Sequence, residues 1–459
     1  MTKQVFSLIV AGALFATFAS PAVPEKVAKR LGEDLTPMGS EKAANSDGSI
    51  PEWDGSGVAN GTDLLKGWDD SKVLPDPYTD DKPVATVTKA TMGQHTDFLS
   101  EGHKALLDTY PSYKMNIYQT RRNCKFHDFV EQGFARNARV GKLVDGGNGI
   151  SEAIMSSPFP IPNSGLEIVW NHTLRYRGHK IQRQFNYAVP TTGGAYTLVY
   201  TTDEVVFPYS SPDSKRAEDL NNISIYFVAH TSAPARSAGN VVLVHETLNM
   251  AREGRKAWTY SPGTRRVRRA PNIAYDNPVT NGDGMGTSDQ YDAYNGAPDR
   301  YDWTVLGKNE RYIMANTYNM ALTPYKELIT PYHANPDAVR YEKRRVWTVE
   351  GNLKPSARHI YAKRRLHYDE DSWQVAGGEL YDGRGELWRV QEITLIADYR
   401  PETHTCWTQG GEFSYDLISG RYLALALKSQ RPTTRVLGLD HLNESYFCLL
   451  YTSPSPRDS

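Results

Sequence analysis

Apolar and polar residues alternate along most of the chain after residue 165. A two-residue period is the pattern of a half-buried strand, because successive side chains point to opposite faces of a sheet. Turn-forming Gly, Pro, Asn and Asp residues separate these segments. The predicted strands are residues 166–170, 182–189, 195–207, 223–230, 241–247, 255–260, 265–269, 345–352, 358–368, 373–381, 387–399, 411–415 and 421–427. The pattern predicts a mainly β protein with a large antiparallel sheet.

Three of the later turns repeat one pattern, at residues 368–373, 381–388 and 415–422. Each strand ends on Tyr-Asp, the turn is polar or Gly-rich, and an aromatic residue opens the next strand. The Asp side chain can cap the turn, and the two aromatic side chains can face each other across the hairpin. Consecutive hairpins predict a meander, in which each strand pairs with its neighbour in sequence.

A further hairpin is predicted around Ser261-Pro262-Gly263-Thr264. Pro in the second position and Gly in the third favour a type II turn, because Gly takes a positive φ at little cost. We therefore expect a tight turn with Gly263 in the left-handed region.

The first third of the chain has a different pattern. Residues 23–83 are rich in Pro, Gly, Asp and Ser, which is typical of an extended arm with turns. Residues 91–110 and 124–141 have helical spacing of apolar residues, and Pro111 ends the first helix. These helices and an Asp/Asn/Gly-rich excursion at residues 272–302 are available to cover an apolar sheet face. Incomplete cover would leave a hydrophobic groove.

The two ends differ from the rest of the chain. Residues 1–22 have the layout of a cleaved export signal, with Lys3, an apolar stretch and small residues up to Ala22. Residues 448–459 read as the translation of a sequencing adapter, so we expect the natural C-terminus to be missing. The β domain is predicted to span residues 84–447. No cysteine lies near the cleavage position, which predicts a periplasmic protein without a lipoprotein anchor.

Composition narrows the choice of function. The formal net charge is −1, which argues against nucleic-acid binding through bulk charge. The 28 Tyr and 9 Trp residues suit strands and apolar binding surfaces. Before the adapter-like tail the cysteines are Cys124 and Cys406. Two cysteines this far apart in sequence leave open whether they pair.

No catalytic or cofactor motif is recognisable. His245-Glu246 lacks the second histidine of a zinc-protease motif. Residues 281–289 offer oxygen ligands without the spacing or closing Glu of a calcium loop, so a solvated loop is favoured. Three consecutive carboxylates lie in a predicted turn, which favours solvation over paired-carboxylate catalysis; they are Asp369, Glu370 and Asp371. We expect no enzyme activity, no metal and no cofactor.

The densest positive charge lies at residues 252–269. One interpretation is a surface for anionic head groups or an acidic partner. The other is the solvated face of an alternating strand, and the alternation favours it. The residues that would form the interaction surface are Arg255, Arg265, Arg266, Arg268 and Arg269.

Five phrases together resemble a proteobacterial family called domain of unknown function 1329. They are residues 31–42 (LGEDLTPMGSEK), 158–165 (PFPIPNSG), 170–178 (WNHTLRYRG), 296–303 (GAPDRYDW) and 358–364 (RHIYAKR). The resemblance runs from about residue 31 to residue 447, which is nearly the whole chain before the adapter-like tail.

This resemblance implies a fold and a setting. The family is grouped with the outer-membrane lipoprotein carriers and receptors LolA and LolB, which implies a curved antiparallel half-barrel with helices over a hydrophobic concavity. It also implies work in the cell envelope beside an RND-type exporter and a companion outer-membrane protein. It supplies no catalytic residues. Four residues of its central phrase are either functional or part of a strand and its turn, namely Trp170, Asn171, His172 and Arg175.

The leading hypothesis is a periplasmic carrier or adaptor that holds a lipid, another hydrophobic molecule or lipoprotein acyl chains on the concave face. One alternative is an envelope sensor or protein-interaction module, which an aromatic-filled concavity would favour. Another is a hydrolase of an envelope polymer, which needs converging carboxylates or histidines. The candidate ligand-binding residues are Trp170, Trp258, Tyr260, Trp347, Trp373 and Trp388.

Overall fold

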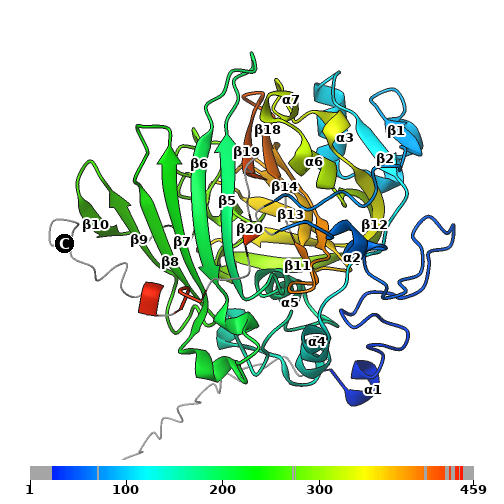
Figure 1. Cartoon of the computed structure of the whole chain (residues 1–459), viewed down its shortest axis with the longest axis vertical. Coiled ribbons are helices and arrows are strands. Elements are labelled where there is room, and N and C mark those ends of the chain that lie inside the picture. Colours follow the sequence, from blue (N-terminus) through cyan, green and yellow to red (C-terminus); the bar gives the residue numbers. More distant parts are fainter. Residues whose placement is uncertain are drawn as a thin grey trace, which may run out of the picture.

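The computed structural model describes residues 23–447 except 70–71, 271–272, 274, 408–410, 429–433, 436–439 and 444. The predicted export signal and the adapter-like tail lie outside the described residues. No helix in the described part of the chain is long and apolar enough to cross a membrane. One large, curved sheet contains 16 of the strands and dominates the molecule (Figure 1).

The helices are few and short. The α-helices are α1 (Glu25–Ala28), α2 (Gly61–Leu64), α3 (Glu101–Thr109), α4 (Asp128–Val140), α5 (Gly165–Thr173), α6 (Tyr318–Leu322) and α7 (Tyr325–Leu328). The 3-10 helices are η1 (Met92–Gln94), η2 (Thr96–Phe98), η3 (Asp145–Gly147), η4 (Pro208–Ser210), η5 (Ala217–Leu220), η6 (Ser288–Gln290), η7 (Pro298–Arg300) and η8 (Pro336–Ala338).

The strands follow the arm and the first helices. They are β1 (Ala85–Val87), β2 (Met115–Tyr118), β3 (Lys142–Val144), β4 (Gly149–Ser151), β5 (Lys180–Ala188), β6 (Val199–Val206), β7 (Ile223–Ala233), β8 (Val241–Thr247), β9 (Lys256–Ser261), β10 (Arg266–Arg269), β11 (Tyr301–Met314), β12 (Tyr341–Leu353), β13 (Lys363–Asp369), β14 (Val375–Tyr381), β15 (Leu387–Ile393), β16 (Ile396–Asp398), β17 (Thr405–Trp407), β18 (Glu412–Asp416), β19 (Arg421–Lys428) and β20 (Thr434–Arg435). The mainly β prediction is confirmed.

The large sheet consists of two meanders joined side by side. In one, β11, β12, β13, β14, β15, β18 and β19 pair in that order, and in the other β5 to β10 pair successively. The meanders meet where β19 runs antiparallel to β5, with Ala424 opposite Ala188. β2 pairs parallel with β12, so the sheet is mixed. The meander prediction is confirmed within each half, but the join brings together strands that are distant in sequence.

Different segments cover the two faces of the sheet. Val390 and Gln391 are adjacent on β15, so their side chains point to opposite faces. α3 packs over Val390. α5 packs over Val349, which shares a row of side chains with Gln391 across β12 to β15. We call the face of Gln391 the loop face, because residues 275–300 also cover it, and the other the opposite face.

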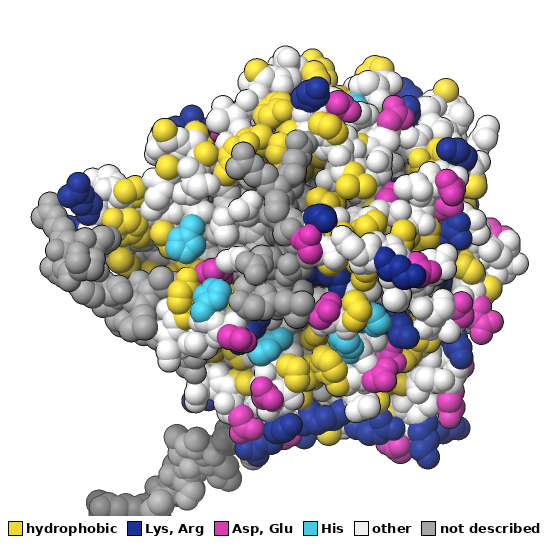
Figure 2. Space-filling model, viewed as in Figure 1, with side chains coloured by type: hydrophobic (Ala, Val, Ile, Leu, Met, Phe, Trp, Pro, Cys, Tyr) yellow, Lys and Arg dark blue, Asp and Glu magenta, His cyan; other side chains and the backbone are white. Residues whose placement is uncertain are grey.

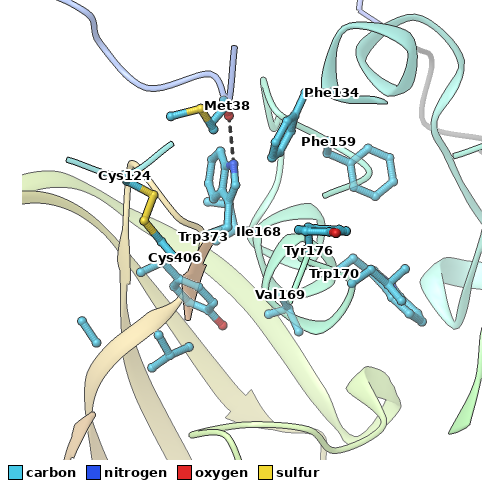
Figure 3. Packing of buried hydrophobic residues seen from close by; sticks show 14 of the residues in the cluster. Met38, Cys124, Phe134, Phe159, Ile168, Val169, Trp170, Tyr176, Trp373 and Cys406 are labelled. Atoms are coloured by element: carbon cyan, nitrogen blue, oxygen red, sulfur yellow. Dashed lines mark hydrogen bonds between the residues drawn. A yellow bond between two sulfur atoms is a disulfide. The ribbon is translucent and has the colours of Figure 1, made fainter. Parts of the chain in front are cut away.

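The largest hydrophobic cluster lies where α4 and α5 meet the loop face (Figure 3). Trp170 and Trp373 are each 1% exposed there. The indole N–H of Trp373 donates to the carbonyl oxygen of Met38 at 2.9 Å, which ties the N-terminal segment to the core. Cys124 and Cys406 form a disulfide in the same cluster, with Cα atoms 5.6 Å apart. The structure thus resolves the pairing that the sequence left open.

Residues 166–170 belong to α5, so the strand predicted there is wrong. The helix begins after Ser164, whose hydroxyl oxygen accepts from the backbone N–H of Glu167 at 3.2 Å. Such N-caps satisfy an otherwise unpaired donor. Ile168, Val169 and Trp170 are all buried, so the helix has no continuous polar face. A short apolar run of this kind cannot be assigned to helix or strand by its period.

The sequence pattern does not predict β11, although its 14 residues make it the longest strand in the described chain. It begins inside the predicted excursion at residues 272–302 and, among the described strands, pairs only with β12. A register shift between Val305 and Gly307 marks a bulge. An edge strand with a bulge and many polar side chains breaks the two-residue alternation.

The turn between β9 and β10 differs from the predicted type II geometry. Gly263 does not take a positive φ; Arg265 does, at 52°. The backbone N–H groups of Thr264 and Arg265 both donate to the carbonyl oxygen of Ser261, at 3.2 and 2.8 Å. The hairpin is confirmed, but its turn is longer, and the left-handed position falls two residues after the expected one, at Arg265.

The two predicted helical segments are confirmed in part. Residues 91–110 form η1, η2 and α3 rather than one helix, because Ser100 starts α3 with a capping box closed by His103. Within residues 124–141 the helix is α4.

The acidic residues Asp369, Glu370 and Asp371 are buried rather than solvated, each at most 3% exposed. Asp371 pairs with Arg122 at 2.7 Å and with Arg344 at 3.3 Å. These partners come from distant parts of the chain, so the turn sequence alone cannot reveal them. Buried carboxylates need such partners, because an unpaired buried charge is costly.

Candidate ligand-binding site

Residues 275–300 form a covering loop over the loop face. Its side chains Val279, Met285 and Tyr291 pack against apolar side chains of β5, β6 and β19. Gly284 takes a φ of 74°, which lets the backbone reverse direction above the sheet. The prediction that this excursion covers an apolar face is confirmed.

A small pocket remains between the covering loop and the sheet. The space in it that a water molecule could occupy is about 10 Å³. Small-molecule sites are usually about 300–1,000 Å³, so the protein's own side chains fill nearly all of this space. The lining residues are Val279, Gln290, Gln391, Ile393, Glu412, Phe413, Ser414, Leu423 and Leu425. None of them is basic.

A buried charge cluster lies beside the pocket. Asp292 of the covering loop pairs with Arg175 and Arg177, both at 2.5 Å. Burial raises the pKa of Asp292, but the two guanidinium groups outweigh this effect and leave the pKa well below its ordinary value. The Nε2–H of His172 donates to the carbonyl oxygen of Asp292 at 2.8 Å. Burial and the charge of Arg175 lower the pKa of His172 to about 3, so the imidazole is neutral.

Glu412 of β18 faces the same cluster and lines the pocket. The backbone N–H of Ala293 donates to its carboxyl group at 3.4 Å. Burial and the negative charge of Asp292 raise the pKa of Glu412 above its ordinary value, which favours the protonated acid. Within the described residues, no three His, Cys, Asp or Glu side chains gather closely enough to hold a metal ion.

The two halves of the covering loop are held differently. In the second half, residues 287–300, Asp289 pairs with Arg364 at 2.5 Å and with His359 at 3.1 Å. Buried charge pairs at Asp289 and Asp292 therefore anchor this half. Residues 279–286 are held by apolar packing, by hydrogen bonds to backbone oxygens and to Asn281, and by the solvent-exposed ion pair Arg421–Asp283 at 2.9 Å, which contributes little. The first half is therefore easier to displace than the second.

Comparison with known proteins assigns the chain to a family. The family model "Protein of unknown function (DUF1329)" matches residues 86–448. The chain belongs to the DUF1329 family. An uncharacterized protein of Pseudomonas aeruginosa is 45% identical over 425 residues, which are 92% of this chain and 92% of the relative.

Several solved structures resemble this DUF1329 chain at 13% identity. A putative outer membrane lipoprotein-sorting protein domain from Vibrio parahaemolyticus gives a TM-score of 0.42 and covers 62% of this chain and 95% of its own. A DUF1329 family protein from Desulfovibrio piger gives 0.40, with 59% and 90% covered. A LolA superfamily protein from Nitrosomonas europaea gives 0.36, with 62% and 100% covered.

The six aromatic residues predicted to bind a ligand do not line one cleft in this DUF1329 protein. Trp170 and Trp373 are core residues of the largest cluster, and Trp347 packs against the same cluster. Trp388 donates from its indole N–H to Asp416 at 2.9 Å. Their shared aromatic character therefore reflects packing at several separate positions.

Trp258 and Tyr260 lie on the opposite face, at β9. Trp258 shares a row of side chains with Leu243 and Val228 across β8 and β7. Phe447 packs in the same cluster, so the end of the described chain partly covers this face. These two aromatic residues are separated from the pocket by the thickness of the sheet.

The predicted basic surface is only partly exposed. The side chain of Arg255 is only 6% exposed and pairs with Glu246 at 2.7 Å, so it offers no free charge to that surface. The residues of β10 are all exposed, with Val267 at 44%, and Arg266, Arg268 and Arg269 lie there beside Arg265 in the turn. Basic and hydrophobic side chains meet at the left of the molecule, over β8 to β10 (Figure 2).

Sequence reasoning missed the pocket residues Gln391 and Glu412. They lie on β15 and β18 and meet only through the register that places Gln391 opposite Ser414. No spacing or motif links them. Both strands carry further polar side chains, so neither residue stands out in the sequence.

Proposed function

We propose that this DUF1329 protein is a carrier or adaptor of the cell envelope that binds a lipid or another hydrophobic molecule between the loop face and the covering loop. The observation that carries the proposal is the pocket itself, which has an apolar wall and is closed by a loop rather than by a strand or a long helix. Val279, Met285 and Tyr291 occupy the space that an apolar ligand would fill.

Binding would require residues 279–286 to move away from the sheet. Their apolar contacts would then be exchanged for contacts with the ligand, and each Å² of apolar area removed from water contributes about 25 cal/mol. The charge pairs at Asp289 and Asp292 would hold the second half of the loop in place during this exchange. Uptake and release therefore need no covalent chemistry.

Export to the periplasm, and work beside an RND-type exporter and an outer-membrane companion protein, are parts of the same proposal. The family resemblance supports them, together with the export-signal layout of residues 1–22. A lipid cargo or the acyl chains of lipoproteins would fit this setting.

The test is native mass spectrometry with lipid extraction, on the full chain exported to a bacterial periplasm. We expect an amphiphile to co-purify and to be lost in Val279→Asp, which places a charge under the covering loop. The matched control is Ile418→Asp, because Ile418 is an exposed apolar residue of the neighbouring β18–β19 hairpin. An empty protein that takes up no added lipid would contradict the proposal.

A second candidate is a protein-interaction module, and the exposed edge at β10 favours it. Within the described residues, Arg265, Arg266, Arg268 and Arg269 are in no ion pair. An acidic envelope protein could add to this edge. A photo-crosslinker at Val267 would then give one adduct in the periplasm, lost on charge reversal of Arg266 and Arg268, whereas the carrier function predicts no such adduct.

A further inference from the structure

The pocket has one polar wall and one apolar wall. Gln391 and Gln290 are each 4% exposed, Ser414 is 7% exposed, and together with Glu412 they form the polar wall. The apolar wall consists of the side chains of Val279, Ile393, Leu423 and Leu425. This division is typical of a site that orients an amphiphile, because a few polar groups fix the orientation and apolar area supplies the affinity.

The polar wall has one unsatisfied acceptor. The Nε2–H of Gln391 donates to the carbonyl oxygen of Ala293 at 3.2 Å. Its Oε1 is buried and has no hydrogen-bond partner among the described residues. Exchanging the amide nitrogen and oxygen would set two oxygens against each other at Ala293, so the acceptor keeps its place. A buried unpaired acceptor is destabilising, and a ligand that donates a hydrogen bond to it would remove that cost.

Gln290 cannot supply the missing donor. Its Nε2–H already donates to Ser414 at 3.3 Å. Its Oε1 accepts from the hydroxyl of Tyr361 at 2.7 Å and from the backbone N–H of Thr287 at 2.8 Å. The unsatisfied group is therefore specific to Gln391, and it needs a donor from outside the described chain.

The pocket is unsuited to an anionic head group. None of its lining residues is basic. The nearby guanidinium groups of Arg175 and Arg177 are paired with Asp292, and that of Arg183 with Asp203 at 2.6 Å. A carboxylate or phosphate placed here would lie beside Glu412 without a free cation, at a large desolvation cost.

We propose that the pocket binds the polar end of an uncharged amphiphile that carries a hydrogen-bond donor, such as a hydroxyl group, with Gln391 Oε1 as its acceptor and the alkyl part against Leu423 and Leu425. This inference rests on the proposed function and names the ligand class for the same site. It excludes fatty acids and phosphate esters as ligands whose head lies in this pocket.

The experiment compares two isomers that differ in the donor. Decanol has a hydroxyl group, and methyl nonyl ether has the same atoms without a donor. Native mass spectrometry of the full chain, titrated with each, should give about tenfold tighter binding of decanol, the value of one hydrogen bond of about 1.4 kcal/mol. Decanoate should bind more weakly than either isomer. This comparison needs no variant and so does not depend on one folding.

Two variants locate the effect. Gln391→Met keeps the size of the side chain and removes the acceptor, so both isomers should bind equally. Ile393→Val is the matched control on the same strand, and it should weaken both isomers alike and keep their ratio.

Equal binding of the two isomers by the unaltered chain would overturn the inference, as would a preference for decanol that persists in Gln391→Met. A crystal structure in which only an ordered water binds Gln391 with decanol present would also overturn it. If neither isomer binds while a periplasmic amphiphile co-purifies, this inference fails and the carrier function stands. If nothing binds at all, both fail.

Discussion

The two halves of the sheet differ in how they are held. The half from β11 to β19 is covered on both faces, by α5 and the covering loop on one and by α3 on the other. Buried ion pairs such as Arg344–Asp371 connect its strands. The half from β5 to β10 ends in a projecting hairpin whose last strand is exposed on both faces (Figure 1).

We expect the half with buried ion pairs to determine the stability of the fold, and the exposed hairpin to contribute little to it. Buried charge pairs are costly to break, because removing one partner leaves the other uncompensated. An exposed arginine costs little to replace. The pocket lies next to the join between the halves, under the covering loop, where β15, β18 and β19 line it and β19 pairs with β5. We expect the half from β11 to β19 to act as a rigid scaffold. The region around the join, with its covering loop, is expected to change its packing when a ligand binds.

The largest effect is expected from breaking the buried network. Asp371→Ala leaves Arg122 and Arg344 without their shared carboxylate. The free energy of unfolding should fall by about 3–5 kcal/mol, measured by urea denaturation. An effect below about 1 kcal/mol would show that this network does not stabilise the scaffold.

Loss of the disulfide should have the next largest effect. Cys124 and Cys406 are 282 residues apart in sequence, so the bond greatly restricts the unfolded chain. The double variant Cys124→Ser/Cys406→Ser should lose about 2–5 kcal/mol in the same assay. The unaltered protein under reducing conditions is the control and should lose a similar amount. If reduction changes nothing, the bond contributes no stability.

The stability of the folded protein should depend on pH through Glu412, which lies next to the join. The folded protein holds the proton of Glu412 more tightly than the unfolded chain does, because its pKa is raised from the ordinary 4.5. Its contribution to stability is therefore complete below pH 4.5 and declines as the pH rises towards the raised pKa.

Glu412→Gln removes this decline. The variant should be more stable than the unaltered protein at pH 8 by about 1 kcal/mol, with little difference at pH 4. Thermal melts at the two pH values measure it. A gain that is the same at both would exclude titration of Glu412 as the cause.

The smallest effect is expected at the exposed edge. Arg268→Ala should change the free energy of unfolding by less than about 0.5 kcal/mol, because β10 is solvated on both faces. Urea denaturation of Arg268→Ala and Asp371→Ala in the same assay compares the two losses in the free energy of unfolding directly. A loss similar to that of Asp371→Ala would end the distinction between scaffold and edge.

The sequence predicts the strands with a buried and a solvated face best. The predicted strand at residues 241–247 coincides with β8. The hairpins predicted at residues 368–373, 381–388 and 415–422 are also present. α5 is missed because burial on all sides removes its period, and β11 is missed because its edge position makes it polar. Both misses have a tertiary cause.

The candidate site could not be predicted in the same way. Gln391 and Glu412 come together through the register of β15 and β18, and the pocket closes only when a loop between β10 and β11 folds back over them. The abundance of Trp drew attention to core residues such as Trp373 instead. Aromatic composition indicates packing, whereas a ligand site depends on which polar groups the packing leaves unpaired.

The central claim is that ligand binds under the covering loop and not at the projecting hairpin. Hydrogen–deuterium exchange of the full chain, with and without a periplasmic lipid extract, tests it most directly. The account predicts altered exchange at residues 279–286 and at β18 and β19, with β9 and β10 unchanged. Altered exchange confined to β9 and β10, with none at the covering loop, would contradict it.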